Sequence, residues 1–172
     1  MLRRSSPSQV GTFRRSGLHK NGEFCAAVKR IYAPSALVEE VVGKLAAPAD
    51  GFVLGTVPPG VTMAPNQNKV QFDKLRGFVA AAKAASGQVI AGGEMFERPG
   101  YFMRPAACTG LAGEAGLMDD EQFCPVIPVV TYDDPSNVVA SIYAGPYGLT
   151  GSIWTAVMRK LVVYRKRTAQ GR

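Results

Sequence analysis

Val126-Ile-Pro-Val-Val-Thr-Tyr132 is a continuous apolar run that leads directly into Asp133-Asp134-Pro135. Short runs of this kind are typical of strands buried on both faces of a parallel sheet. An acidic residue followed by proline favours a helix start, because proline is well suited to the first turn. The two stretches together predict a buried strand followed by a helix.

Working outward, the same alternation recurs along the chain. Val28 to Ala33 has the pattern of a buried strand, and Ser35 is expected to cap a helix that follows. A second helix is expected from Asn68 to Ser86. Its predicted apolar face consists of Val70, Leu75, Phe78, Val79 and Ala82. Further strands are predicted at Gln88 to Ala91, Tyr101 to Arg104 and Leu149 to Thr155. The sequence therefore predicts an α/β fold, a mainly parallel sheet flanked by helices in three layers.

The positive charge of the chain is concentrated at its ends. The 172 residues carry a formal charge of +7, yet residues 1–20 and 157–172 contain basic residues and no acid. The remaining stretch has nine basic and thirteen acidic residues, a net charge of −4. A nucleic-acid-binding face would place its positive charge on the folded part, so we expect no nucleic-acid partner. No apolar run approaches the roughly 18 residues of a membrane span, so we expect no membrane partner either.

The cysteine content indicates a reducing compartment. Three cysteines are an odd number without paired spacing, which argues against a disulfide framework. His19 is the only histidine, so we expect no metal site. These features favour the cytoplasm. The Arg- and Ser-rich residues 1–20 also fit a mitochondrial transit peptide.

Cys25 is the candidate nucleophile. It follows the glycine-containing turn Asn21-Gly-Glu-Phe24, which could hold its sulfur at a loop edge. On local context alone, a buried apolar role is the more frequent one for a single intracellular cysteine.

Five motifs, in order along the chain, favour a catalytic role for Cys25 over a buried apolar one. They are Gly22-Glu23-Phe24-Cys25, Ala64-Pro65 with Gln71-Phe72-Asp73-Lys74, Gly100-Tyr101-Phe102 with Pro105, Glu121-Gln122-Phe123-Cys124-Pro125 and Tyr147-Gly148-Leu149. Their order and spacing resemble the catalytic domain of the aldehyde dehydrogenase superfamily over about residues 20–156. The resemblance divides the chain into a poorly structured basic segment (1–20), a partial catalytic domain (21–156) and a basic tail (157–172).

The resemblance implies oxidation of a small-molecule aldehyde to a carboxylic acid with NAD or NADP. Cys25 would form a thiohemiacetal and then a thioester. Glu121 would bind the nicotinamide-side ribose, Phe123 would pack beside the nicotinamide, and Gln71 and Lys74 would reach the adenosine-side ribose. Without the family, Phe123 would be interpreted as core, and Gln71 and Lys74 as a solvated helix face.

The chain also departs from the family pattern. The family's dinucleotide-binding domain precedes the nucleophile, whereas this sequence begins 24 residues before Cys25. We therefore expect a chain truncated at both ends and nearly inactive by itself. The alternative is a non-catalytic fragment that associates with full-length relatives through the family's oligomer contacts. Cys124 stands where the family has glycine, which would strain a left-handed backbone there. Tyr143 replaces an asparagine that braces the active-site loops of the family.

Overall fold

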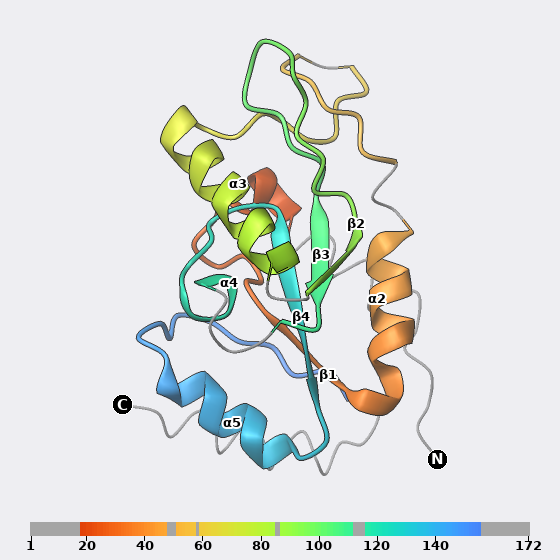
Figure 1. Ribbon diagram of the computed structural model, residues 1–172, viewed down its shortest axis with the longest axis vertical. Helices are drawn as coiled ribbons and strands as arrows, with labels where there is room; N and C mark the ends of the chain where they lie inside the picture. Colours follow the sequence, from red (N-terminus) through yellow and green to blue (C-terminus); the bar gives the residue numbers. More distant parts are fainter. Residues whose placement is uncertain (1–17, 48–50, 58, 85–86, 112–115, 156–172) are drawn as a thin grey trace.

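The computed structural model describes residues 18–47, 51–57, 59–84, 87–111 and 116–155, and the two predicted terminal segments lie almost entirely outside these ranges. Helices and strands alternate through most of the described chain (Figure 1). The elements, in order, are η1 (His19–Gly22), β1 (Ile31–Pro34), η2 (Ser35–Leu37), α2 (Val38–Ala46), α3 (Lys69–Ala84), β2 (Gln88–Ala91), β3 (Ala106–Thr109), α4 (Gly116–Asp119), β4 (Val126–Tyr132) and α5 (Pro135–Ala144).

The four strands form one sheet in the order β1-β4-β3-β2. β4 runs parallel to β1 on one side and to β3 on the other, while β2 pairs antiparallel with β3 at the far edge. The prediction of an α/β fold with a mainly parallel sheet is therefore confirmed. The Val126–Tyr132 run forms β4, one of the two inner strands, which is why it is continuously apolar.

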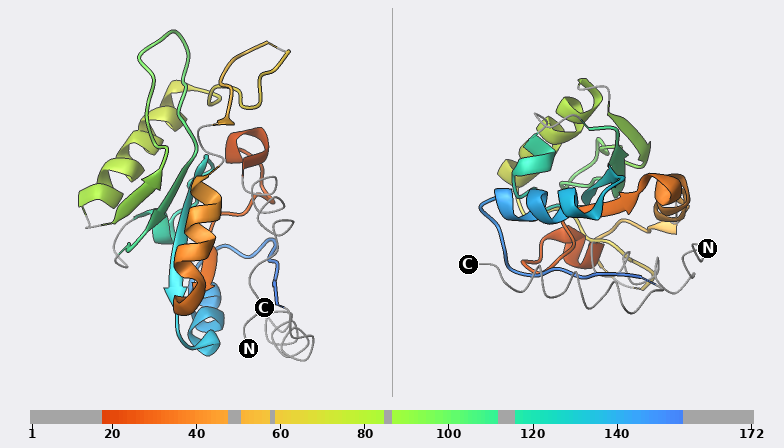
Figure 2. Two further views of the ribbon diagram at one scale, coloured as in Figure 1. Left: turned by 90° about the vertical axis from the view of Figure 1, so that its right-hand side faces the viewer. Right: turned by 90° about the horizontal axis from the view of Figure 1, so that it is seen from below.

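Helices cover both faces of this sheet and make three layers (Figures 1 and 2). Neighbouring residues of β4 point to opposite faces: Val126 packs in the cluster beneath α3, and Ile127 packs in the cluster beneath α2. Strand and helix side chains thus form two hydrophobic cores, one on each side of the sheet. α5 follows β4 and lies near the end of the sheet where β1 and β4 finish (Figure 1).

The apolar face of α3 differs at one position from the prediction. Leu75, Phe78, Val79 and Ala82 are buried as expected, but Val70 is 81% exposed. Phe72 is buried in its place, because it lies one turn before Leu75 and two turns before Val79 on the same face. The helix itself spans Lys69–Ala84, within the predicted range.

Two strand predictions were wrong. Tyr101 to Arg104 contributes only an isolated bridge between Met103 and Met95, and the strand of the sheet is β3, beginning at Ala106. Residues 149–155 form no strand in the described structure. Both predictions relied on aromatic and β-branched residues, which favour strands only where a neighbouring strand is available.

The helix starts also divide into one confirmed and one wrong prediction. Asp134 caps α5, its carboxylate accepting from the backbone N–H of Ser136 at 2.9 Å, with Pro135 at the first turn. Ser35 does not cap α2, whose N-cap residue is Leu37 without a side-chain hydrogen bond. The Ser35 hydroxyl instead donates to the carboxylate of Asp133 and joins the end of β1 to the end of β4.

Candidate functional site

Cys25 lies on an irregular turn between η1 and β1, and it is exposed. The element before this turn, η1, is irregular, because Lys20, Asn21 and Gly22 all have positive φ. The other two cysteines are buried. Burial raises the pKa of Cys108 to about 11 and that of Cys124 to about 12, so both stay protonated thiols near neutral pH. Cys25 is therefore the cysteine that a small molecule can reach.

The turn is fastened on one side to the segment that precedes α3. The Asn21 side-chain amide donates to the carbonyl of Pro65 at 2.7 Å, and Asn21 is 4% exposed. The Glu23 carboxylate accepts from the backbone N–H of Gln67 at 3.0 Å. Burial raises the pKa of Glu23, although the Gln67 N–H and the charge of Lys29 act in the opposite direction. These bonds hold the residues just before Cys25 against a segment about forty positions further along the chain.

Glu121, Gln122 and Phe123 form a loop whose backbone carbonyls are held by α3. Lys74 donates to the carbonyl of Glu121 at 2.9 Å. Gln71 donates from one side-chain nitrogen to the carbonyls of Gln122 at 2.7 Å and Phe123 at 2.8 Å. The two helix residues are one turn apart, so they bind consecutive groups of the loop together.

The residues before β1 hold this loop and the segment that leads into it. Arg30 donates to the carbonyls of Met118 and Asp120, the latter at 3.2 Å. Gln122 is fully buried and donates to the carbonyls of Lys29 at 2.6 Å and Val126 at 3.1 Å. Arg30 and Gln122 did not figure in the sequence prediction, because a side chain that binds a distant backbone carbonyl leaves no motif.

Phe123 carries the left-handed conformation of this loop, with φ of 48°. Cys124, which replaces the glycine of the family motif, is not among the residues with positive φ. The strain anticipated at Cys124 thus lies one residue earlier. Such a conformation costs a non-glycine residue about 1 kcal/mol or more, and the hydrogen bonds around the loop offset it.

Lys29 connects the Cys25 turn to the Glu121–Phe123 loop. Its ammonium donates to the carbonyls of Gly22 at 2.8 Å and Phe24 at 3.1 Å, and it lies 4.5 Å from the centre of the Phe123 ring. Burial lowers the pKa of Lys29, while the charges of Glu121 and Cys25, among others, act to raise it. The ammonium thus binds the residue before Cys25 and lies over the ring of Phe123, two residues after Glu121, so it contacts both loops.

The structure therefore brings all the predicted site residues to one region. Cys25 is exposed, and Glu121 and Phe123 are partly exposed. Lys29 joins the turn that carries Cys25 to the loop that carries Glu121 and Phe123. Gln71 and Lys74 are directed at the loop backbone and not only at solvent. The arrangement offers a reachable thiol, a carboxylate and an aromatic ring around a positive charge, which suits attack on a polarised carbon by a sulfur nucleophile.

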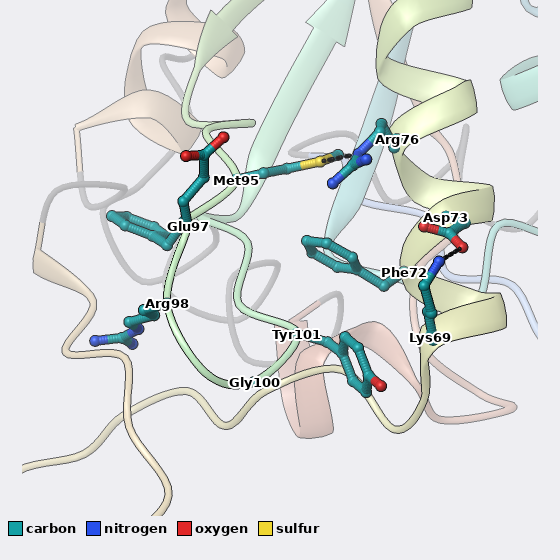
Figure 3. A pocket seen from close by; sticks show the side chains of 10 residues that line it. Lys69, Phe72, Asp73, Arg76, Met95, Glu97, Arg98, Gly100 and Tyr101 are labelled. Carbon is teal, nitrogen blue, oxygen red and sulfur yellow. Dashed lines mark hydrogen bonds and ion pairs between the residues drawn. The ribbon is translucent and has the colours of Figure 1, made fainter.

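A separate cavity of about 530 Å³ lies between α3 and residues 95–101 (Figure 3). Its α3 wall presents Lys69, Phe72, Asp73 and Arg76, which come from a different side of the helix than Gln71 and Lys74. None of the predicted site residues lines it. The described residues contain no group of three or more potential metal ligands. No helix in these ranges has the length and hydropathy needed to cross a bilayer.

Comparisons with known proteins agree with these features. The family model "Aldehyde dehydrogenase family" matches residues 8–172. Betaine aldehyde dehydrogenase of Cereibacter sphaeroides is 26% identical over 87% of this chain and 31% of its own length. 1-Pyrroline-5-carboxylate dehydrogenase of Staphylococcus haemolyticus is 30% identical over 78% of this chain and 26% of its own length. The chain thus spans about a third of the length of these relatives.

The fold has the same relatives. The structure of an NAD+ complex of aldehyde dehydrogenase from Bacillus cereus superimposes with a TM-score of 0.88 at 23% sequence identity, over 97% of this chain and 34% of that one. At this level of identity the likeness concerns the fold. With the family match over almost the whole sequence, it establishes that the chain belongs to the aldehyde dehydrogenase family.

Proposed function

We propose that the protein containing this chain oxidises an aldehyde to a carboxylic acid with NAD or NADP, and that Cys25 is its nucleophile. The observation that carries the proposal is the placement of an exposed thiol on a turn tied through Lys29 to the loop of Glu121 and Phe123. Since the chain spans about a third of its relatives, the complete activity is proposed for the whole protein.

Cys25 would act by covalent catalysis. Its thiolate attacks the aldehyde carbon, the carbon–oxygen double bond opens, and a thiohemiacetal forms. The backbone N–H of Cys25 could donate to the oxygen that gains negative charge. Loss of a hydride from the thiohemiacetal leaves a thioester, and water then releases the acid and restores the thiol.

The residues present suit the nicotinamide end of a dinucleotide. Within the described chain the Glu121 carboxylate makes no hydrogen bond to protein, so both oxygens remain available to the two hydroxyls of a ribose. The ring of Phe123 is partly exposed beside it. A bound NAD or NADP would accept the hydride. We assign Gln71 and Lys74 the task of holding this loop in place, in addition to the ribose contact implied by the resemblance.

The substrate is proposed as a class, an aldehyde. The two relatives compared above are named for different compounds, betaine aldehyde and 1-pyrroline-5-carboxylate, at similar levels of identity. Both are named as dehydrogenases, and the family model that matches this chain is that of the aldehyde dehydrogenases, so the class is proposed without a particular compound.

The proposal is tested on the whole protein that contains this chain, by mass spectrometry after exposure to an aldehyde with NAD or NADP. The expected product is an adduct at Cys25 with the mass of the aldehyde less two hydrogen atoms, absent from Cys25→Ala. An adduct that persists in Cys25→Ala would contradict the assignment. If no adduct forms and the chain co-elutes with a full-length relative in size-exclusion chromatography, the non-catalytic alternative replaces it.

A further inference from the structure

Lys29 is partly buried and makes several connections within the candidate site. Two of its ammonium hydrogens are directed at the carbonyls of Gly22 and Phe24, which precede Cys25. The same ammonium lies over the ring of Phe123, and the Lys29 carbonyl accepts from the buried Gln122. One residue therefore contacts both sides of the site through its side chain and its backbone.

These contacts constrain the direction of the Cys25 turn. Because the Lys29 ammonium binds the carbonyls of Gly22 and Phe24, the chain from Gly22 to Lys29 is held in a closed loop. This loop contains Cys25, which is exposed. Hydrogen bonds from a charged donor contribute more than neutral ones, and a cation over an aromatic face adds to them where solvent is partly excluded.

The groups that interact electrostatically with Lys29 are carboxylates and cysteines. Glu121 and Glu23 both interact electrostatically with the ammonium, and so does Cys25 when it carries a negative charge. The other ammonium of the site, that of Lys74, is bound to the carbonyl of Glu121, whereas Lys29 binds the carbonyl of Phe24, next to Cys25. A positive charge in this place is expected to matter for any anion approaching the sulfur.

We infer that Lys29 is a positioning residue of the proposed reaction: it locks the Cys25 turn against the Glu121–Phe123 loop and places a positive charge beside the nucleophile. The inference rests on the proposed function of Cys25. It goes further in assigning the coupling between the nucleophile and the cofactor loop to one side chain.

Lys29→Met and Lys29→Arg separate the charge from the packing, with Lys44→Met on α2 as a lysine control outside the site. The effect of the Lys29 charge on Cys25 is measured by the Cys25 alkylation rate with anionic iodoacetate divided by the rate with neutral iodoacetamide. Both probes react with the same thiolate, so the ratio reports the local potential and not the degree of ionisation. We expect the ratio to fall about threefold in Lys29→Met and to be retained in Lys29→Arg and Lys44→Met.

The locking is measured by amide hydrogen exchange in peptides covering residues 21–28 and 121–125. Lys29→Met should exchange faster in both peptides, whereas a local defect would affect only the first. An unchanged alkylation ratio together with unchanged exchange in residues 121–125 overturns the inference. If Lys29→Met does not fold, Lys29→Gln, which keeps a donor without the charge, carries the same measurements.

These readouts do not require turnover, so the two proposals can fail separately. If aldehyde adducts form equally fast at Cys25 in wild type and Lys29→Met, the positioning role is wrong and the nucleophile assignment stands. If no aldehyde reacts at Cys25 yet the ratio and the exchange change as expected, the reaction is wrong and the coupling of the two loops stands.

Discussion

The two polar sides of α3 have similar compositions but different partners. Toward the candidate site, Gln71 and Lys74 donate to three consecutive backbone carbonyls of the Glu121–Phe123 loop. Toward the cavity of Figure 3, Lys69 pairs with Asp73 at 2.5 Å and both are largely exposed. Side chains that bind a backbone about fifty residues away determine where that backbone lies. Side chains that pair along their own helix do not position any other segment.

The comparison predicts that changes on the site side cost stability and changes on the cavity side do not. A carbonyl that loses its partner inside the protein pays its desolvation cost, about 1–3 kcal/mol. An exposed ion pair within one helix contributes about 0.3–0.5 kcal/mol, and salt screens it.

The largest effect is expected for Gln122→Ala. The substitution removes both hydrogen bonds of a fully buried amide and leaves a space beside the carbonyls of Lys29 and Val126. We expect the free energy of unfolding to fall by about 2–4 kcal/mol, measured by urea denaturation. Gln67→Ala, at an exposed position, is the matched control and should change it by less than about 0.5 kcal/mol.

Gln71→Ala is expected to have the next largest effect. It frees the carbonyls of Gln122 and Phe123 together, so the free energy of unfolding should fall by about 1–3 kcal/mol. Arg76→Ala on the cavity side loses a contact between its guanidinium and the sulfur of Met95 at 3.4 Å. It should lower the free energy of unfolding by about 1 kcal/mol or less. Equal losses in the two variants would show that the two sides of α3 do not differ.

High pH should lower the free energy of unfolding through the buried thiol of Cys124, which follows the Glu121–Phe123 loop. Cys124 ends the held loop, and burial raises its pKa to about 12, as burial raises that of Cys108 to about 11. Unfolding exposes thiols that release their protons from about pH 9 upward, so the native state binds more protons and stability falls as pH rises. The loss should be on the order of 1 kcal/mol per pH unit for each thiol between pH 9 and 11.

Unfolding measured by urea at pH 8, 9, 10 and 11 follows this loss. Cys124→Ala should start from a lower stability and then decline less steeply with pH. A decline as steep as in wild type would mean that Cys124 is not the group responsible.

The smallest effect is expected for Lys69→Ala. Its side chain is 70% exposed, and its ammonium pairs with Asp73 four residues along the helix. We expect a change below about 0.5 kcal/mol in low salt that disappears in 0.5 M NaCl. A loss that persists in high salt would assign the cavity side a structural role comparable to that of the site side.

Part of the fold was predictable because its signals are local. The run that forms β4 and the Asp134-Pro135 start of α5 need no distant information, and both have the predicted positions. β3 was missed because Ala-Ala-Cys-Thr contains only one residue typical of strands, and it is a strand through its pairing with β4 and β2. Leu149 to Thr155 shows the opposite error, since favourable residues there pair with no strand in the described chain.

The candidate site was predictable through motifs and not through contacts. Cys25, Glu121 and Phe123 belong to segments that resemble a family, so their residue numbers could be named in advance. Lys29, Arg30 and Gln122 act on backbone carbonyls, which every residue possesses, so no residue pattern reveals the pairing. Phe123 is the clearest case: its left-handed backbone follows from the bonds around it and could not be anticipated from its identity.

Iodoacetamide labelling of the native chain, followed by peptide mapping, tests the central claim that Cys25 is the reachable nucleophile. Cys25 should be modified well before Cys108 and Cys124, and more slowly when an aldehyde is present. Labelling spread equally over the three cysteines, or a rate at Cys25 that no aldehyde changes, would contradict it.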